Sequence, residues 1–279
     1  MWSVGISVST STEAARLGYD DRQINRIVIR MARYFLERDM RVIFGHDWRE
    51  DGVMRAVADF AGVVGAGVGA VEERERTHRS VDLGKLAEER MINVVPAGRD
   101  SLSGAAVDAE RDSGGVLRVI PLIEARKHVS ERARSAMRIP NVDLVDPRVA
   151  QLTELRHWLT AMLDPGCRVC IGGVTDRFQG RMPGVIEEAE LALQYRKPLY
   201  LLGGLGGATR AFGIVQMHCD MGYWHAKNGL SIKEKTELFE TTDMERGIRL
   251  IWRGIKSLRV KGGESKADYS RGDTRKGTK

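Results

Sequence analysis

A chain of 279 residues, of which 42% are hydrophobic and 29% charged, has the composition of a globular protein, which excludes a fibrous or largely disordered chain. Residues 259–279 hold seven basic and three acidic side chains, which is +4 of the net charge of +6, so the rest of the chain carries only +2. We interpret this segment as a disordered basic tail, with weak attraction to polyanions as the alternative.

The cysteines and the hydropathy of the chain indicate in which cellular compartment the protein is expected. Three cysteines, Cys167, Cys170 and Cys219, in a chain without a signal peptide favour a reducing interior over a disulfide scaffold. Cys167 and Cys170 form a C-x-x-C, but they lie in a strand-like apolar run, and no second Cys/His pair stands at metal spacing. No apolar run approaches the roughly 18 to 20 residues that cross a bilayer. We therefore expect a cytoplasmic protein without metal, cofactor or membrane contact.

The first part of the chain predicts alternating strands and helices. Residues 2–9 (WSVGISVS) read as a strand, a polar loop follows, and apolar residues at helical spacing predict a helix from about Arg22 to Arg38. Residues 40–47 (MRVIFGHD) predict a second strand, and a helix begins near Gly52. This order implies right-handed crossovers and a parallel sheet.

The middle of the chain is highly charged and less regular. Two strand-like runs, MINVVPAG and VLRVIPLI, are separated by a polar, glycine-containing segment. We expect an insertion at about 71–115, with a mobile loop around 100–115.

The alternation resumes in the last part of the chain. The predicted elements are a helix to about 163, a strand at CRVCIGGV, a helix at about 183–195, a strand at PLYLLGG, and a helix at 208–218. A last helix, 243–258, is expected to pack on the body or on a second subunit through one apolar face, which holds Met244, Ile248, Ile251, Trp252 and Ile255.

These elements predict a single α/β domain, a Rossmann-like parallel sheet with helices on both faces, over residues 1–240. Residues 241–258 would add the C-terminal helix, and 259–279 the tail. A symmetric dimer through that helix is the expected assembly.

Ligands of open parallel sheets bind beyond the carboxyl ends of the strands, where free backbone N–H groups converge. Glycine lets those groups approach an anion, although tight turns also use it for steric reasons. The spacing is neither G-x-G-x-x-G nor that of a P-loop, so neither a dinucleotide dehydrogenase nor a P-loop NTPase is supported. The candidate ligand-binding residues at these ends are Ser7, Ser9, Gly45, His46, Asp47, Arg49, Gly172, Gly173, Gly203, Gly204, Gly206 and Gly207.

The helix expected at 183–195 offers a second set of candidates. Pro183 suits a first helical turn, and Gly180 and Gly184 leave its N-terminus open for a phosphate. Arg181 could pair with that phosphate while Glu188 reaches ribose hydroxyls or a base. The alternative is that the glutamates only offset the helix dipole and Arg181 is a surface cation.

The segments GISVSTS, FGHDWREDGV, IGGVTDRFQGRMPGVIEEA and PLYLLGGLGGA together resemble the SLOG superfamily. This Rossmann-like group contains the cytokinin-activating LOG phosphoribohydrolases and the DprA/Smf proteins. The resemblance covers residues 2 to about 60 and 165–212. It is greatest to the SLOG families of bacterial conflict and nucleotide-signalling systems.

The resemblance implies roles for particular residues. LOG enzymes bind phosphate with a G-G-x-G-T-x-x-E motif that supplies a catalytic glutamate with an arginine nearby, which places Gly180, Arg181, Gly184 and Glu187 or Glu188 in those roles. The motif here lacks the threonine and follows an added segment, 175–179, so the resemblance favours binding over hydrolysis. His46 replaces a glycine of the signalling families, while Asp47 and Arg49 are retained; this histidine would contact the ligand or cap the following turn.

Three functions follow. The first is a sensor of a nucleotide or nucleotide-derived signal in a bacterial defence or signalling system, acting through homo-oligomer assembly or an effector protein. The second is an N-glycosidic hydrolase in which Glu187 or Glu188 stabilises an oxocarbenium-like centre, with Asp47 the only evident second carboxylate. The third is DprA-like nucleic-acid binding through the tail, which the nearly neutral body disfavours.

Overall fold

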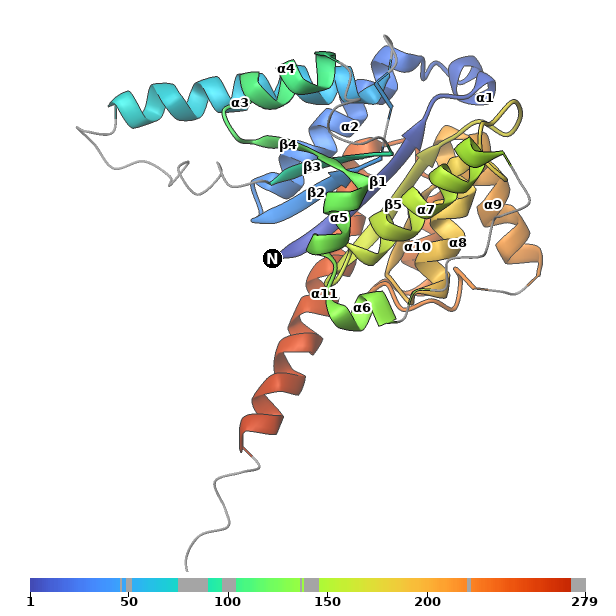
Figure 1. Cartoon of the computed structure of the whole chain (residues 1–279). Helices are drawn as coiled ribbons and strands as arrows, with labels where there is room; N and C mark the ends of the chain where they lie inside the picture. Colours follow the sequence, from blue (N-terminus) through green and yellow to red (C-terminus); the bar gives the residue numbers. More distant parts are fainter. Residues whose placement is uncertain are drawn as a thin grey trace, which may run out of the picture.

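A parallel sheet with helices on both faces forms the body of the protein (Figure 1). This is a computed structural model, and it describes residues 1–45, 47–48, 52–74, 90–96, 104–135, 137, 146–219 and 222–271, with side chains of 67–74 and 261–271 left aside. The predicted Rossmann-like α/β fold is confirmed.

All strand pairs in the sheet are parallel, and the strand order is β4-β3-β2-β1-β5-β6. The chain therefore builds outward from β1 to β4 and then returns to add β5 on the other side of β1. The strands are β1 (Trp2–Ser9), β2 (Met40–Phe44), β3 (Met91–Val95), β4 (Leu117–Pro121), β5 (Gly166–Gly172) and β6 (Leu199–Leu202). The reversal of direction between β1 and β5 is where such sheets open a crevice for ligands.

The helices begin where the sequence supplies caps and apolar faces. The Asp20 carboxylate accepts the N–H of Gln23 at the start of α2, and Asp146 with Pro147 starts α7 in the same way. The helices are α1 (Thr12–Arg16), α2 (Asp21–Leu36), α3 (Val53–Arg74), α4 (Gly104–Asp112), α5 (Leu122–Ala125), α6 (Glu131–Ser135), α7 (Pro147–Ala161), α8 (Gly184–Gln194), α9 (Gly207–His218), α10 (Ile232–Glu240) and α11 (Met244–Arg271), with short 3-10 helices η3 (Arg126–His128) and η4 (Gly203–Leu205).

The buried apolar side chains divide between the two faces of the sheet. Helices α2, α3 and α11 cover one face, where Phe35, Met54 and Ile251 join the same cluster as the strand residues. On the other face α5 and α7 cover β2, β3 and β4, while α8 and α9 cover β5 and β6. The site described below lies at the carboxyl ends of the strands, beside α8 and α9.

The segment expected to be an insertion at 71–115 contains parts of the fold. Residues 91–95 form β3, an inner strand of the sheet, and 104–112 form α4. Ala106 of α4 is buried in the main core. The prediction of a loop at 100–115 was therefore wrong for 104–112. This segment is short and highly charged, so its apolar helical period is weak. Residues 75–89 and 97–103 lie outside the described residues.

The C-terminal helix packs on the body of its own chain. Met244, Ile248, Ile251 and Ile255 are buried in the main core, and Trp252 packs against it. The apolar face that suggested a dimer through this helix is thus already covered, which removes the basis for that contact. Helical backbone continues past residue 258 to Arg271, and 272–279 lie outside the described residues.

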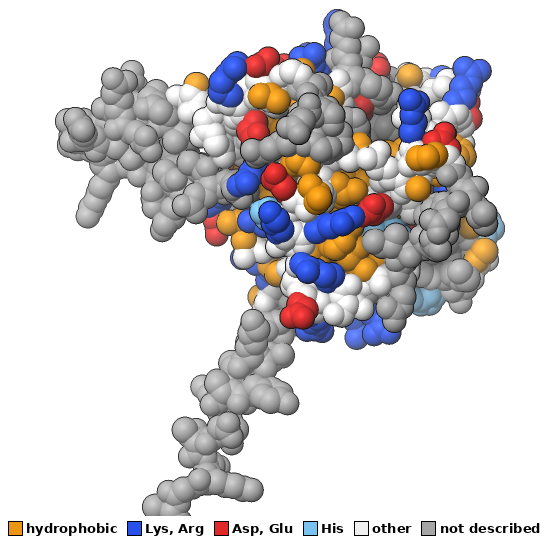
Figure 2. All heavy atoms as spheres, in the orientation of Figure 1, with side chains coloured by type: hydrophobic (Ala, Val, Ile, Leu, Met, Phe, Trp, Pro, Cys, Tyr) orange, Lys and Arg blue, Asp and Glu red, His pale blue; other side chains and the backbone are white. Residues whose placement is uncertain are grey.

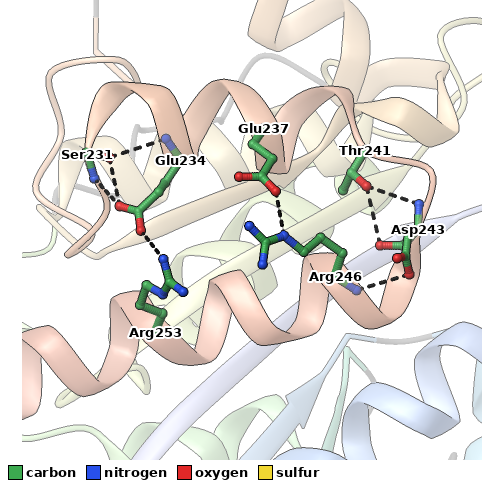
Figure 3. Close-up of polar contacts among 7 residues, drawn as sticks. All are labelled: Ser231, Glu234, Glu237, Thr241, Asp243, Arg246 and Arg253. Carbon is green, nitrogen blue, oxygen red and sulfur yellow. Dashed lines mark hydrogen bonds and ion pairs between the residues drawn. The ribbon is translucent and has the colours of Figure 1, made fainter.

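Helices α10 and α11 form an antiparallel pair joined by polar contacts (Figure 3). Ser231 and Glu234 form a reciprocal capping box at the start of α10. Arg253 of α11 pairs with Glu234 at 2.7 Å, and Arg246 pairs with Glu237. These contacts fix α10, which was not predicted, against α11.

Within the described part of the chain, every helix is too short or too polar to traverse a lipid bilayer.

Candidate functional site

The carboxyl ends of β1 and β5 are held together directly. The Ser9 carbonyl at the end of β1 accepts the N–H of Gly173 at 2.7 Å, and the Gly173 carbonyl accepts the N–H of Ala208 at 2.8 Å. Gly173 has a φ of +96°, and a Cβ on Gly207 would lie 2.5 Å from the Gly173 carbonyl oxygen. These glycines are needed because α9 begins in contact with the end of β5.

The N-terminus of α8 is open. Pro183 occupies the N-cap position without a capping side chain, and the first helical bond runs from the Glu187 N–H to the Pro183 carbonyl. The N–H groups of the first turn therefore lack intrahelical acceptors. This is the end of a helix that favours an anion.

An arginine that the sequence did not single out lies over this helix end. A Cβ on Gly180 would stand 2.5 Å from Nη1 of Arg156, and one on Gly184 would stand 2.7 Å from its Nη2. The two predicted glycines thus make room for the guanidinium of Arg156, which projects from α7. A cation beside the positive end of a helix is unfavourable by itself, and a bound anion would offset that cost.

Glu187 holds Arg156 in place. Its carboxylate pairs with Arg156 and accepts the hydroxyl of Thr153 at 2.9 Å, and its side chain is only 4% exposed. Both carboxylate oxygens are thereby engaged with α7. Glu187 therefore positions Arg156 and has no carboxylate oxygen left over for a ligand.

Arg181 does not join this pair. It is exposed, and its charge acts on His157 of α7 and on Glu190 of α8. Burial lowers the pKa of His157; Glu187 opposes this shift and Arg181 adds to it. Partial desolvation raises the pKa of Glu190, which is still exposed, and Arg181 opposes that rise. Arg156 is the arginine that pairs with Glu187 and whose guanidinium lies beside Gly180 and Gly184.

Glu188 turns toward the sheet. Its Oε2 accepts hydrogen bonds from the Ser7 hydroxyl and, at 2.7 Å, from Nη1 of Arg168. The Oε1 atom lies 3.8 Å from the position that a Cβ on Gly45 would take, and no hydrogen bond to it occurs within the described ranges. With 12% of the side chain exposed, Glu188 presents an acceptor near the ends of β1 and β2.

A fully buried arginine fixes Glu188. Arg168, in the middle of β5, is 0% exposed and also donates to the hydroxyl of Thr160 at 3.1 Å. A Cβ on Gly5 would stand 2.8 Å from its Nη1, so β1 must carry glycine opposite this side chain. Burial raises the pKa of the neighbouring Cys170 to about 12, which keeps the thiol protonated and fits a packing role.

The end of β2 forms the next wall. The Gly45 carbonyl accepts the amide of Asn93 at 2.8 Å, and Asn93 accepts the indole N–H of Trp48 at 2.8 Å. Asp47 is half-buried here, and its carbonyl accepts the N–H of Met54. The candidates His46 and Arg49 lie outside the described residues.

The glycines after β6 divide into two pairs. A Cβ on Gly203 would come within 3.0 Å of the Phe239 ring, and one on Gly204 would come within 3.0 Å of residue 241, so this pair serves packing against α10 and its end. Gly206 and Gly207 have positive φ values of +72° and +68° at the start of α9. There the Gly207 N–H already donates to the carboxylate of Glu13 at 2.6 Å.

The site residues on α7 and β5 were not predicted, although the sequence contains a pattern that indicates them. Thr153, Arg156 and Thr160 stand at i, i+3 and i+7 on α7, which is a polar stripe directed at α8 and β5. Arg168 is a charge inside the apolar run CRVCI, and such a residue requires a buried partner.

The geometry defines a Rossmann-like α/β protein with an open, arginine-flanked helix N-terminus beside the reversal point of its sheet. Residues 1–221 match the family model SLOG cluster2, and the chain belongs to this family. The resemblance to the SLOG superfamily is thereby confirmed, and the family suggests a nucleotide-related function. Neither the curated proteins nor the solved structures yielded a match to the chain.

Proposed function

We propose that the protein binds a nucleotide or a nucleotide-derived signal in the crevice between the ends of β1, β5 and α8. A phosphate of the ligand would lie at the α8 N-terminus beside Arg156. The observation that carries the proposal is the placement of the Arg156 guanidinium over Gly180 and Gly184 at an uncapped helix end. Family membership supports a nucleotide as the ligand class.

The comparison of two helix ends selects α8 over α9. Both helices start at the carboxyl ends of strands, as ligand-binding helices of such sheets do. At α9 the carboxylate of Glu13 already accepts the N–H of Gly207, so the chain supplies its own anion there. At α8 no side chain caps the helix N-terminus at Pro183, and the guanidinium of Arg156 lies beside it.

Glu188 supplies the second recognition element of the proposal. Its Oε2 is fixed by Ser7 and Arg168, so its Oε1 has a set direction toward the end of β2. An acceptor held in this way suits a ribose hydroxyl or a base N–H, because the side chain loses little freedom on binding. His46, Asp47 and Arg49 remain candidates at the same strand end.

The way Arg156 is held supports a sensing role. A phosphate at α8 would share this guanidinium with Glu187, and the pair joins α7 to α8. Binding would therefore change the packing of two helices that cover the sheet, and the chain would pass that change to a partner copy or an effector in a bacterial defence or signalling system.

Hydrolysis of an N-glycosidic bond is the second candidate. It is favoured by the carboxylate of Glu188, which Arg168 fixes and which is 12% exposed. It is disfavoured by Glu187, whose two oxygens are both engaged and whose side chain is buried. Hydrolysis would thus need Glu188 with Asp47 as acid or base.

A thermal-shift panel tests the proposal, because a ligand that binds the native state stabilises it. The panel contains nucleoside monophosphates, NAD and cyclic oligonucleotides, and each sample is then analysed for released base. We expect at least one nucleotide to raise the melting temperature without turnover. Release of free base that Glu188→Gln abolishes would establish the enzyme instead, and a flat panel would contradict nucleotide binding.

A further inference from the structure

The loop between β5 and α8, residues 174–182, is held by polar contacts only at its two ends. The Gly173 N–H donates to the Ser9 carbonyl at 2.7 Å, and the Pro183 carbonyl accepts the first hydrogen bond of α8. Between these points, residues 174–182 form no hydrogen bond and no ion pair with any residue that the structure describes. In Figure 1 the loop lies beyond the carboxyl ends of the strands. Loops that bind ligands are commonly of this kind, because they open at little cost in free energy.

The loop exposes an aromatic ring at Phe178. This residue is 39% exposed, and it belongs to none of the apolar clusters formed by the described residues. The other five phenylalanines of the chain are buried in one of these clusters or pack against it; they are Phe35, Phe44, Phe60, Phe212 and Phe239. Phe178 therefore leaves apolar surface in water, and covering that surface would be favourable.

The residue before this ring has a strained backbone. Arg177 has a φ of +51°, in the left-handed region that residues with a Cβ adopt at a cost. Such conformations recur at ligand clamps and switch segments. The loop thus places a strained residue beside an exposed ring, and the packing of the body explains neither.

Phe178 stands close to the proposed phosphate position. It precedes Gly180 by two residues, so the two Cα atoms are at most about 7 Å apart. Gly180 in turn adjoins the Arg156 guanidinium, since a Cβ on Gly180 would stand 2.5 Å from Nη1. The ring is therefore within reach of a small molecule whose phosphate lies beside Arg156 at the α8 N-terminus.

The neighbours of Phe178 favour a small ligand over a protein partner. The exposed polar residues around it are Thr175, Asp176, Arg177 and Gln179. A protein partner needs a contiguous apolar patch, whereas a nucleotide base needs one ring on which to stack. Figure 2 shows Lys and Arg side chains at the surface in the upper right part of the molecule, where Figure 1 draws this loop, and such charges suit a ligand that carries phosphate.

We propose that Phe178 recognises the base of the bound nucleotide, and that residues 174–182 close over the base when it binds. The proposal rests on the proposed nucleotide site at the α8 N-terminus and adds the part of that site which selects for a base. The Phe178 ring stacks on the base while Arg156 and the helix end hold the phosphate. Because every base has an aromatic face, the site is expected to discriminate weakly between bases and strongly against a sugar phosphate without one.

Calorimetric titration of the full chain tests this role. The two ligands are the nucleotide of the thermal-shift panel that most raises the melting temperature, and ribose 5-phosphate, which lacks a base. Phe178→Ser is expected to weaken nucleotide binding by at least about tenfold, the loss of one stacked base, and to leave the affinity for ribose 5-phosphate unchanged. Phe178→Trp, which keeps an aromatic ring, should bind the nucleotide like wild type. Ile232→Ser, which removes a 57% exposed apolar side chain from α10, is the control and should have no effect.

The variants separate the role of Phe178 from the site on which it rests. If Phe178→Ser binds the nucleotide as tightly as wild type while Arg156→Gln binds it more weakly, the phosphate site stands and the role of Phe178 is overturned. If neither variant weakens binding, the ligand does not lie at the α8 N-terminus, and the proposed function fails as well. A panel in which no nucleotide binds overturns both.

Limited digestion with trypsin tests the closure of the loop. Arg177 is exposed and lies in a segment without hydrogen bonds to the described part of the chain, so trypsin is expected to cleave after it in the free protein. Saturating nucleotide should slow this cleavage several-fold in wild type but not in Phe178→Ser, and cleavage after exposed Arg259 should not change. Cleavage after Arg177 at the same rate with and without nucleotide would overturn the closure.

Discussion

Two adjacent glutamates on α8 reach opposite partners. Successive residues of a helix differ by about 100° in direction, so Glu187 meets α7 and Glu188 meets β1 and β5. The sequence predicted that Glu188 faces a ligand, but it could not predict the partners of either glutamate, because Arg156 and Arg168 come from elements distant in the chain. Each glutamate has an arginine of its own.

Glu187→Gln tests the positioning pair. It leaves Arg156 without its carboxylate in a largely buried place, and the free energy of unfolding should fall by about 3 kcal/mol. Urea denaturation measures this loss. Glu190→Gln, three residues later and exposed on the same helix, is the control and should change stability by less than about 0.5 kcal/mol. Equal effects of the two substitutions would contradict the structural role of Glu187.

Gly184→Ala tests the space under Arg156. The added Cβ would stand 2.7 Å from Nη2, the far end of a flexible side chain, so the guanidinium can shift and the fold should survive. We expect a stability change below about 1 kcal/mol and a loss of nucleotide affinity of about tenfold, measured by titration calorimetry. Gly104→Ala, where a Cβ meets nothing within 4 Å, is the matched control. Unchanged affinity in Gly184→Ala would argue against a ligand at this helix end.

At the scale of elements, regular patterns made the sheet predictable. β1 was predicted with its observed bounds, Trp2–Ser9, and β5, β6, α2 and α8 lie within a few residues of the predicted ranges, because each has a clear apolar period. Helix α10 was missed since it is short and only its last apolar pair, Leu238 and Phe239, reaches the core. Its stability comes from its cap and from α11.

The α10 cap makes a pH-dependent contribution to stability. The Arg253 guanidinium, followed by the N–H and hydroxyl of Ser231, lowers the pKa of Glu234 to about 2. A carboxyl group with a lowered pKa stabilises the fold above its unfolded pKa of about 4.3, and that contribution is lost as the pH falls toward about 2.

Glu234→Gln should therefore cost about 1 kcal/mol at neutral pH, and the difference from wild type should shrink between about pH 4.3 and pH 2. Denaturant unfolding at several pH values measures it. Glu240→Gln, at the exposed end of the same helix, should differ from wild type by less than about 0.5 kcal/mol throughout. A deficit in Glu234→Gln that persists undiminished at about pH 2 would contradict this assignment.

At the scale of the whole molecule, strand order places the sites. The chain leaves β1 in one direction and returns on its other side, which brings Ser7 and Gly45 from the first part of the chain to Glu188 from the last part. The predicted order of strands and helices is compatible with this strand order, but it does not determine on which side of β1 the strand β5 is added. The C-terminal helix was predicted to pack on the body or on a second subunit, and the three-dimensional structure shows that its apolar face completes the core of its own chain.

Binding of a nucleotide to Arg156 variants tests the central claim most directly. Calorimetric titration with the nucleotide that most raises the melting temperature is expected to show affinity reduced at least about tenfold in Arg156→Gln, and in the double variant Arg156→Gln with Glu187→Gln, in which neither partner is left unpaired. Exposed Arg26→Gln should bind as wild type. If both Arg156 variants bind the nucleotide as tightly as wild type, the ligand does not lie at the α8 N-terminus.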